Sequence, residues 1–412
     1  MKVLGIVSEY NPFHKGHEYH LKESKISVSA DFVVCVMSGN FLQRGEPALF
    51  NKWIRAEAAI KCGVDIVFEL PAPYACNSAE HFAQKAISLL DRLGCVTHLS
   101  FGSESGNIHD IIKLADPLLF QSEEYKKLLK KYMDEGFSFP RANQAATEVY
   151  ASHIEPSILS SPNNILGIEY MKALYSEKSS IEPITVKRHV AGYHDTSIQR
   201  DKNICSASAI RSHLESGYSL DSMKDFMPVG SYETIQKYWA SGIKPTFFAD
   251  FFELIQYKLL SLAPEDLKKI YSVREGIEHR LIAMAKKSNS LEELITRIKT
   301  KRYLRTGIQR MLTHILLNIT QEDMHYLNQP NSHYGRLLAA SSEGLTLLRH
   351  IKKKELSRMP LITNINKEVH PSTNLSKQLS YDILANDIYN LVASPSRKQD
   401  FSDYIIFPYI QQ

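Results

Sequence analysis

The sequence lacks the features that mark membrane, secreted and disulfide-stabilised proteins. Its 412 residues include only five cysteines, an odd number, and no two of them have the C-x-x-C spacing of a zinc ribbon. No uncharged apolar stretch reaches the roughly 18 residues that a membrane span needs. The apolar residues before Glu9 are too few for the core of a signal peptide. We therefore expect a protein of a reducing compartment, the cytoplasm.

The common phosphate-binding motifs are missing as well. Neither G-x-x-x-x-G-K-[ST] nor G-x-G-x-x-G occurs, and we find no internal repeat or low-complexity tract. The chain is 43% hydrophobic and 23% charged, with a formal net charge of +4. Such a chain is long enough to bury a core without disulfides and to form two or three domains.

Apolar runs alternate with amphipathic stretches in the N-terminal half. Continuous runs rich in β-branched residues occupy residues 2–7, 31–37, 64–70, 96–101 and 184–189. Amphipathic helical patterns cover residues 52–62 and 78–93, with a helical insertion at about 108–174. Continuous apolar runs are typical of strands covered on both faces, and their alternation with helices predicts a parallel sheet.

Ligands of such sheets bind at the carboxyl ends of the strands. These ends are predicted at residues 9–16, 38–47, 70–74, 102–106 and 189–194. The pattern changes after about residue 219, where long helical patterns follow at 247–262, 267–287, 290–297 and 302–320. We therefore expect an α/β domain over residues 1–220 and a mainly helical domain over 221–412.

The first strand-to-helix turn contains His14-Lys15-Gly16-His17. The N–H groups at a helix N-terminus form an anion site, and two histidines three residues apart can both point at one phosphate. Gly16 lets the backbone approach closely. The alternative is a pair of surface histidines in a turn. The position directly after a buried strand favours a phosphate site.

A second phosphate signal is Ser206-Ala207-Ser208-Ala209-Ile210-Arg211, which follows the fifth strand and opens a helix. Serine hydroxyls, helix N–H groups and an arginine fork suit a triphosphate. Alone, this string is better explained by an ordinary serine N-cap with an exposed arginine. Together with the histidine turn, it favours nucleotide binding.

This pair of motifs resembles the HIGH-motif nucleotidyltransferase superfamily, and longer strings resemble its tRNA(Met) cytidine acetate ligase family. The strings are EYNPFHKGHEYHL (9–21), MSGNFLQRGEPA (37–48), FELP (68–71), FGSE (101–104), PNNILGIEY (162–170), KRHVAGYHD (187–195), KTKRYLRTGIQRML (299–312) and RLLAASSEGLTLL (336–348). The resemblance implies a Rossmann-like sheet of the nucleotidyltransferase type. It also implies a ligase that converts ATP and acetate to acetyl-adenylate and acetylates N4 of the wobble cytidine of elongator tRNA(Met).

Carried over position by position, the resemblance implies a nucleotide site in residues 1–220. Its ATP-binding residues would be Val7, Ser8, Glu9, Tyr10, Asn11, Pro12, Phe13, His14, Lys15, Gly16, His17, Glu18, Tyr19, His20, Gly102, Asn163 and Arg188. His14 and His17 would be catalytic, and Ser206, Ser208 and Arg211 are secondary phosphate candidates. Mg²⁺ is expected with the phosphates, without assigned ligands. No organic cofactor, membrane or obligate protein partner is implied.

Two local features need separate interpretation. Lys15 stands where family members often have Asn, and a lysine beside phosphates is compatible with ATP. Arg44 and Glu46 follow the second strand and are bracketed by glycine and proline. They could belong to an exposed loop, but we favour a wall of the acetate or cytidine pocket.

The C-terminal domain carries a basic block over residues 297–358. Twelve basic and four acidic residues give this block a net charge of +8, although the whole chain has only +4. Such a block is typical of phosphate-backbone binding, and a solvated helix face is the alternative. We assign tRNA binding to Lys299, Lys301, Arg302, Arg305 and Arg310, with Tyr303 among them.

Two other functions remain possible at this point. One is a small-molecule nucleotidyltransferase, which would have no need of the basic block. The other is a non-catalytic RNA-binding protein with a vestigial nucleotide pocket. The intact histidine turn and SASAIR string argue against the latter.

Overall fold

The fold is described from a computed structural model. It describes residues 1–116, 122–137, 139–150, 158, 161–188, 205–274, 276–329, 333–368, 374–394, 396 and 398–411. The strand end expected at residues 189–194 lies outside this part of the chain. Within it, no helix has the length and apolar character needed to cross a membrane. All five cysteines are unpaired thiols.

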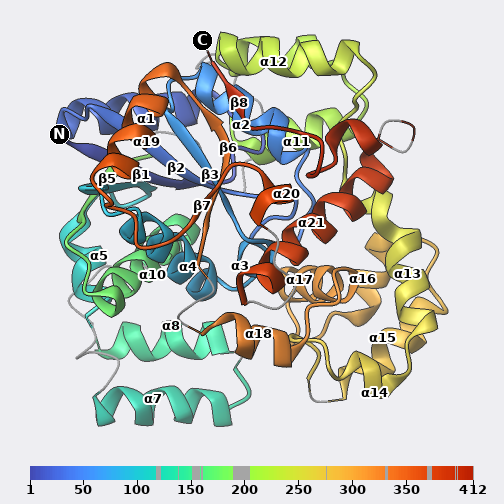
Figure 1. Ribbon diagram of the computed structural model, residues 1–412. Helices are drawn as coiled ribbons and strands as arrows, with labels where there is room; N and C mark the ends of the chain where they lie inside the picture. Colours follow the sequence, from blue (N-terminus) through green and yellow to red (C-terminus); the bar gives the residue numbers. More distant parts are fainter. Residues whose placement is uncertain are drawn as a thin grey trace.

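A mixed sheet forms the centre of the protein (Figure 1). Its described strands are β1 Val3–Ser8, β2 Phe32–Ser38, β3 Ile66–Leu70, β4 His98–Ser103, β5 Glu182–Lys187, β6 Gly335–Ala340, β7 Leu361–Ile362 and β8 Tyr409–Ile410. The order is β5-β4-β1-β2-β3-β6-β7, with β8 paired to β6. All five strands expected from the apolar runs are present, and they are parallel to one another.

The order of these strands creates a switch point at β1. The chain adds β2 and β3 on one side of β1 and then returns to add β4 and β5 on the other. The loops that follow β1 and β4 therefore diverge at the carboxyl edge and leave a crevice there. The register brings these ends level, because Ser8 pairs with Met37, and Ser103 with Lys187.

Helices cover both faces of the sheet. Those of the first half are α1 Lys15–Val28, α2 Lys52–Lys61, α3 Ala72–Ala75, α4 Ala79–Arg92, α5 Ile108–Leu114, α7 Glu123–Asp134, α8 Phe139–Tyr150, α10 Pro162–Glu177 and α11 Ala207–Glu215. One face packs against α4, α5, α10 and α19 (Ser342–Lys353). The other packs against α1, α2, α11 and α12 (Val229–Ala240). This burial on both faces explains why the strands read as continuous apolar runs.

The rest of the chain is mainly helical. It comprises η2 Leu220–Phe226, η3 Phe248–Phe251, α13 Phe252–Ser261, α14 Pro264–Leu267, α15 Ile277–Ala285, α16 Leu291–Ile298, α17 Arg305–Leu316, α18 Gln321–Leu327, α20 Ile365–Glu368, α21 Asn374–Ala393 and η4 Lys398–Phe401. Helices α13 to α18 (yellow and orange in Figure 1) pack beside the sheet around a core that they share with the loop after β2, α3 and α21. The single helix expected at 267–287 is wrong. Helix α14 ends at Leu267, and α15 begins only at Ile277, directly after Gly276 with its φ of +81°.

The C-terminal half also returns to the sheet, which the sequence did not suggest. Strand β6 pairs antiparallel with β3, and β7 and β8 pair with β6. Residues 335–340 read GRLLAA, which contains no β-branched residue. Local propensity therefore gave no strand signal, and pairing with β3 determined the structure. The division at 220/221 remains a prediction about domains, although the sheet itself includes strands from both sides of it.

A buried ion cluster joins this C-terminal segment to the sheet. The Lys52 Nζ lies 2.9 Å from Glu69 and 2.9 Å from Asp403, and Arg336 lies 3.3 and 3.0 Å from the same two carboxylates. All four side chains are at most 3% exposed. Two cations and two anions balance one another, so the charges can stay buried.

Candidate active site at the carboxyl ends of the strands

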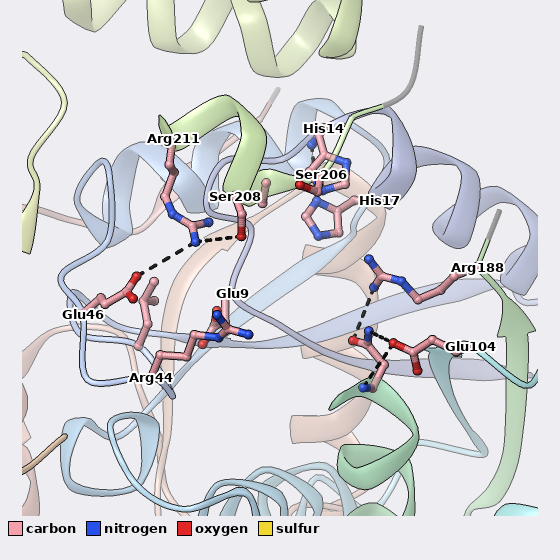
Figure 2. A pocket seen from close by; sticks show the side chains of 13 residues that line it. Glu9, His14, His17, Arg44, Glu46, Glu104, Arg188, Ser206, Ser208 and Arg211 are labelled. Atoms are coloured by element: carbon pink, nitrogen blue, oxygen red, sulfur yellow. Dashed lines mark hydrogen bonds and ion pairs between the residues drawn. The ribbon is translucent and has the colours of Figure 1, made fainter. Parts of the chain in front are cut away.

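A pocket of about 350 Å³ opens where the sheet order switches (Figure 2). It is lined by Glu9 and the histidine turn after β1, the loop after β2, Glu104 after β4, Arg188 after β5, and the start of α11. The full lining is Glu9, His14, His17, Leu42, Arg44, Glu46, Glu104, Asn163, Arg188, Ser206, Ala207, Ser208 and Arg211. Segments far apart in sequence therefore meet at one site, as expected for the carboxyl edge of a parallel sheet.

The first βα turn is built to present its histidines. His14 is the N-cap of α1, with its side chain accepting from Gly16 and His17 completing a capping box. The two rings stack with centroids 3.9 Å apart. Phe13 is buried, and its ring lies 5.5 Å from that of His17. The turn thus holds both imidazoles in fixed orientations.

These hydrogen bonds also fix which ring nitrogen carries the proton. The Nδ1 atom of His14 accepts the Gly16 N–H at 3.0 Å, and Nδ1 of His17 accepts the His14 N–H at 3.3 Å. Burial, reinforced by the charge of Arg188, lowers the pKa of His14 to about 3 and that of His17 well below its usual value. Both rings are therefore neutral near pH 7. An imidazole that accepts at Nδ1 carries its hydrogen at Nε2, so each ring offers an Nε2–H donor to a ligand.

A chain of side chains fixes the opposite wall. The Glu104 carboxylate accepts from the Asn163 side chain at 2.6 Å and from the backbone N–H of Asn164 at 3.1 Å, at the start of α10. Asn163 in turn accepts from Arg188 at 3.4 Å. A Cβ on Gly102 would lie 3.3 Å from the Arg188 side chain, so the glycine leaves that side chain room. Arg188 thus enters the pocket as an oriented cation.

Helix α11 supplies a second cation. Ser206 caps the helix by accepting the Ala209 N–H at 3.0 Å. Arg211 donates to the backbone oxygen of Asn11 at 3.1 Å and to the Ser208 hydroxyl at 3.2 Å. The arginine is therefore held between α11 and the first βα turn, beside the free N–H groups of a helix N-terminus.

The loop after β2 forms the third wall and connects to α17. A Cβ on Gly45 would lie 2.3 Å from the backbone nitrogen of Arg310, so only glycine permits this contact. The Gly45 oxygen accepts from Thr313 at 2.7 Å, and the Glu46 carboxylate accepts from Gln309 at 3.2 Å. The loop and α17 are thus one packed unit, and the helical part of the chain contributes indirectly to the pocket.

The chain is similar to known proteins over nearly its whole length. A family model described as HIGH nucleotidyl transferase matches residues 1–403. The chain belongs to this family. The tRNA(Met) cytidine acetate ligase of Acetivibrio thermocellus is 42% identical over 398 residues, which cover 94% of each chain. The ligase of the same name from Alkaliphilus metalliredigens is 40% identical, over 100% of this chain and 99% of its own.

Solved structures also match the whole chain. Thermotoga maritima TmcAL, in a crystal structure with bound alpha-thio ATP, matches with a TM-score of 0.91 and 31% identity over 100% of both chains. The apo form of that protein matches with a TM-score of 0.92. The α/β fold class expected from the sequence is therefore confirmed.

The structure brings together eight of the residues that the HIGH-family resemblance and the SASAIR string suggested. These are Glu9, His14, His17, Asn163, Arg188, Ser206, Ser208 and Arg211. The other suggested residues do not line the pocket, namely Val7, Ser8, Tyr10, Asn11, Pro12, Phe13, Lys15, Gly16, Glu18, Tyr19, His20 and Gly102. His20, for example, is within 3.1 Å of the Ser100 hydroxyl. Their ATP-binding role stays a prediction.

Sequence reasoning assigned no role to Glu104, Leu42 or Ala207, which also line the pocket. Glu104 ends the quoted string FGSE, directly after a predicted strand, and that position was the available signal. Arg44 and Glu46 also line the pocket, and their role as a wall for acetate or cytidine stays a prediction.

The basic block is not one surface. Lys299, Lys301 and Arg302 are exposed, whereas Arg305 forms an ion pair with Glu292 at 2.5 Å. Arg310 lies against the pocket loop, and burial lowers its pKa.

The C-terminal part of the block lies elsewhere. Arg336 is buried in the ion cluster and cannot contact a ligand at the surface. Arg358 donates its backbone N–H to Arg92, which precedes the amino end of β4 and thus lies at the opposite edge of the sheet from the pocket. The count of +8 therefore overstates the charge available near the pocket.

Proposed function

We propose that this chain activates acetate with ATP and transfers the acetyl group to N4 of the wobble cytidine of elongator tRNA(Met). One observation carries the proposal. Two neutral histidine donors and two oriented arginines surround a pocket at the switch point of the sheet. The near full-length similarity to proteins named tRNA(Met) cytidine acetate ligase supplies the reaction. We expect it to act in the cytoplasm.

The first step needs stabilisation of phosphate charge. An acetate oxygen attacks the α-phosphorus of ATP in line with the departing diphosphate, and negative charge grows on the phosphate oxygens. The Nε2–H groups of His14 and His17 would donate to these oxygens. Because the rings are already neutral and oriented, they need no proton loss or reorientation during the reaction.

The leaving diphosphate needs its own site. Ser206 and Ser208 open α11, and Arg211 lies beside them. Helix N–H groups and an arginine fork suit a diphosphate. Arg188, held by Asn163, would hold the nucleotide from the other side.

Mg²⁺ would supply further neutralisation of the phosphates when bound. Magnesium keeps several waters and binds through substrate phosphates and one or two carboxylates, rather than through an all-protein cage. The described residues fit this pattern, since they contain no cluster of three acidic, histidine or cysteine ligands, while the Glu46 carboxylate lines the pocket. Diphosphate and water would therefore provide most of its ligands.

The tRNA would approach along α17. Lys299, Lys301 and Arg302 lie exposed just before this helix, and its middle packs against the pocket loop through Gly45, Gln309 and Thr313. Phosphates bound at those cations would place the RNA next to the pocket. Arg305 and Arg310 would contribute less, because one is paired with Glu292 and the other is largely buried.

A single incubation tests the proposal. The protein is mixed with ATP, labelled acetate and bulk tRNA, and the nucleosides of the recovered tRNA are separated. Label in N4-acetylcytidine supports the proposal. Acetate-dependent exchange of diphosphate into ATP without label in tRNA would indicate a small-molecule enzyme. Binding of tRNA without either reaction would indicate the non-catalytic alternative.

A further inference from the structure

The second reaction, which rests on the proposed function, releases a proton that some group must accept. The cytidine N4 attacks the acetyl carbonyl carbon and forms the new C–N bond, while the bond from that carbon to the AMP oxygen breaks. AMP leaves with the bond's electron pair, and N4 must lose one hydrogen as a proton. A positioned base typically contributes 10²–10⁴-fold to such a step.

The histidines of the pocket cannot be this base. Each accepts a backbone N–H at Nδ1 and therefore carries its hydrogen at Nε2, so neither nitrogen has a lone pair free for the proton. The serines are occupied too, because Ser206 caps α11 and Ser208 accepts from Arg211. The remaining proton acceptors of the described lining are three carboxylates: Glu9, Glu46 and Glu104.

Two of the three carboxylates are engaged at both oxygens. Glu104 uses Oε1 for the Asn163 side chain and Oε2 for the Asn164 N–H, and so holds the start of α10. Glu46 uses Oε1 for Gln309, and its Oε2 faces Arg211 at 4.0 Å. A proton on either carboxylate would disturb a contact that shapes the pocket.

Glu9 is different. Its Oε1 accepts the backbone N–H of Gln43 at 2.8 Å, and within the described part of the chain its Oε2 has no hydrogen-bond partner. Arg55 donates to its backbone oxygen at 2.5 Å, which anchors the residue directly after β1. Figure 2 shows the side chain between the arginine of α11 and the wall formed by Glu104 and Arg188. Leu42 supplies an apolar neighbour in the same lining.

We propose that Glu9 is the catalytic base of acetyl transfer, with Oε2 taking the proton from N4 of the cytidine. A carboxylate is a poor neighbour for phosphates, so the same residue is better suited to the acceptor base than to ATP. The loop that holds its Oε1 is the loop packed on α17. The packed pair of this loop and α17 would therefore both bind the RNA and position the base.

The surroundings of Glu9 give the step a defined pH dependence. Burial raises its pKa, opposed by the Gln43 hydrogen bond and by Arg211 and Arg44, while Glu46 adds to the rise. The other groups that face it are Arg55 from α2 and Tyr170 from α10. A base works only when ionised, so the transfer rate should fall as pH drops through this raised pKa.

The test separates the two half-reactions. Acetyl-adenylate is formed on the protein from ATP and acetate, with pyrophosphatase present, and a single turnover onto tRNA is timed from pH 4.5 to 8. For Glu9→Gln, which keeps the acceptor for Gln43, we expect transfer about 100-fold slower or worse at the plateau, without the rise of rate with pH. Transfer is timed only after acetyl-adenylate has accumulated, so a slower formation of the adenylate does not enter the measured rate. An unchanged melting temperature shows that the variant is folded.

Glu46→Gln is the matched comparison, because it removes the other carboxylate charge beside Arg211. Its rate of acetyl transfer should still rise with pH, even if the plateau of that rate changes. Transfer by Glu9→Gln at the parental rate would overturn the assignment. A rise of rate with pH that survives in Glu9→Gln, or that disappears in Glu46→Gln, would overturn it as well. A parent protein with neither exchange nor transfer would refute the proposed function itself, and this assignment with it.

Discussion

Replacing His17 by alanine tests the phosphate chemistry most directly. The change removes one Nε2–H donor from the pocket and leaves the backbone of α1 in place. It also removes the ring that stacks on His14 at 3.9 Å and accepts the His14 N–H at 3.3 Å. We expect formation of acetyl-adenylate to fall while the protein stays folded.

The size of each effect follows from the contacts. Loss of one donor to a developing oxyanion costs about 2.7–4 kcal/mol, or roughly 10²–10³ in rate. Loss of one N-terminal capping contact costs about 0.5–2 kcal/mol of stability, well below the 5–15 kcal/mol that typically stabilises a fold. The rate should therefore change far more than the melting behaviour.

The assay is acetate-dependent exchange of labelled diphosphate into ATP, measured for the parent, for His17→Ala and for Lys22→Ala. Lys22 is exposed on the same helix and serves as the control. The pH profile adds a second check. With a pKa of about 3, His14 is only about 0.1% protonated at pH 6, so histidine titration should leave the exchange rate flat between pH 5.5 and 8. Exchange by His17→Ala at the parental rate, or a parental rate that changes steeply near pH 6.5, would refute the donor role.

Three further expectations concern residues around the site. Lys15→Asn should keep exchange activity within a few-fold, because Lys15 does not line the pocket, and a collapse to background would show a phosphate contact on that lysine. Joint replacement of Lys299 and Lys301 by alanine should weaken tRNA binding at any sequence and reduce the salt slope by about two, whereas Arg305→Ala should change the slope less because Arg305 is paired with Glu292. Equal slopes in all variants would show that these cations are only solvated surface charges. Arg336→Ala should lower the free energy of unfolding by about 3–5 kcal/mol, because it leaves Lys52 as the remaining cation of the cluster beside Glu69 and Asp403. An unchanged midpoint of denaturant unfolding would contradict the buried cluster.

Much of the α/β part could be predicted because its signals are local. A strand buried on both faces must be apolar along its whole length, and the runs at 31–37 and 64–70 became β2 and β3 within two residues. The histidine turn was recognisable because a helix that begins directly after such a strand must offer its N–H groups at the carboxyl edge.

Only the tertiary structure determined the features that arise from contacts between residues far apart in the chain. The string GRLLAA became β6 because β3 offered an unpaired edge, which no local pattern encodes. Arg336 counted as part of a basic block until the fold buried it against Glu69 and Asp403. The contact of Gln309 with Glu46 joins residues 263 positions apart.

The same division applies to the chemistry of the site. The sequence alone predicted that two histidines, an arginine and a serine-capped helix would share one site, because each belongs to a short motif with its own physical reason, and all of them line the pocket. Only the fold decided that Glu104 caps α10, that Glu46 is tied to α17, and that Glu9 keeps an oxygen free among the described contacts. Hydrogen bonds saturate, so a carboxylate's role depends on which partners reach it, and those partners come from distant segments.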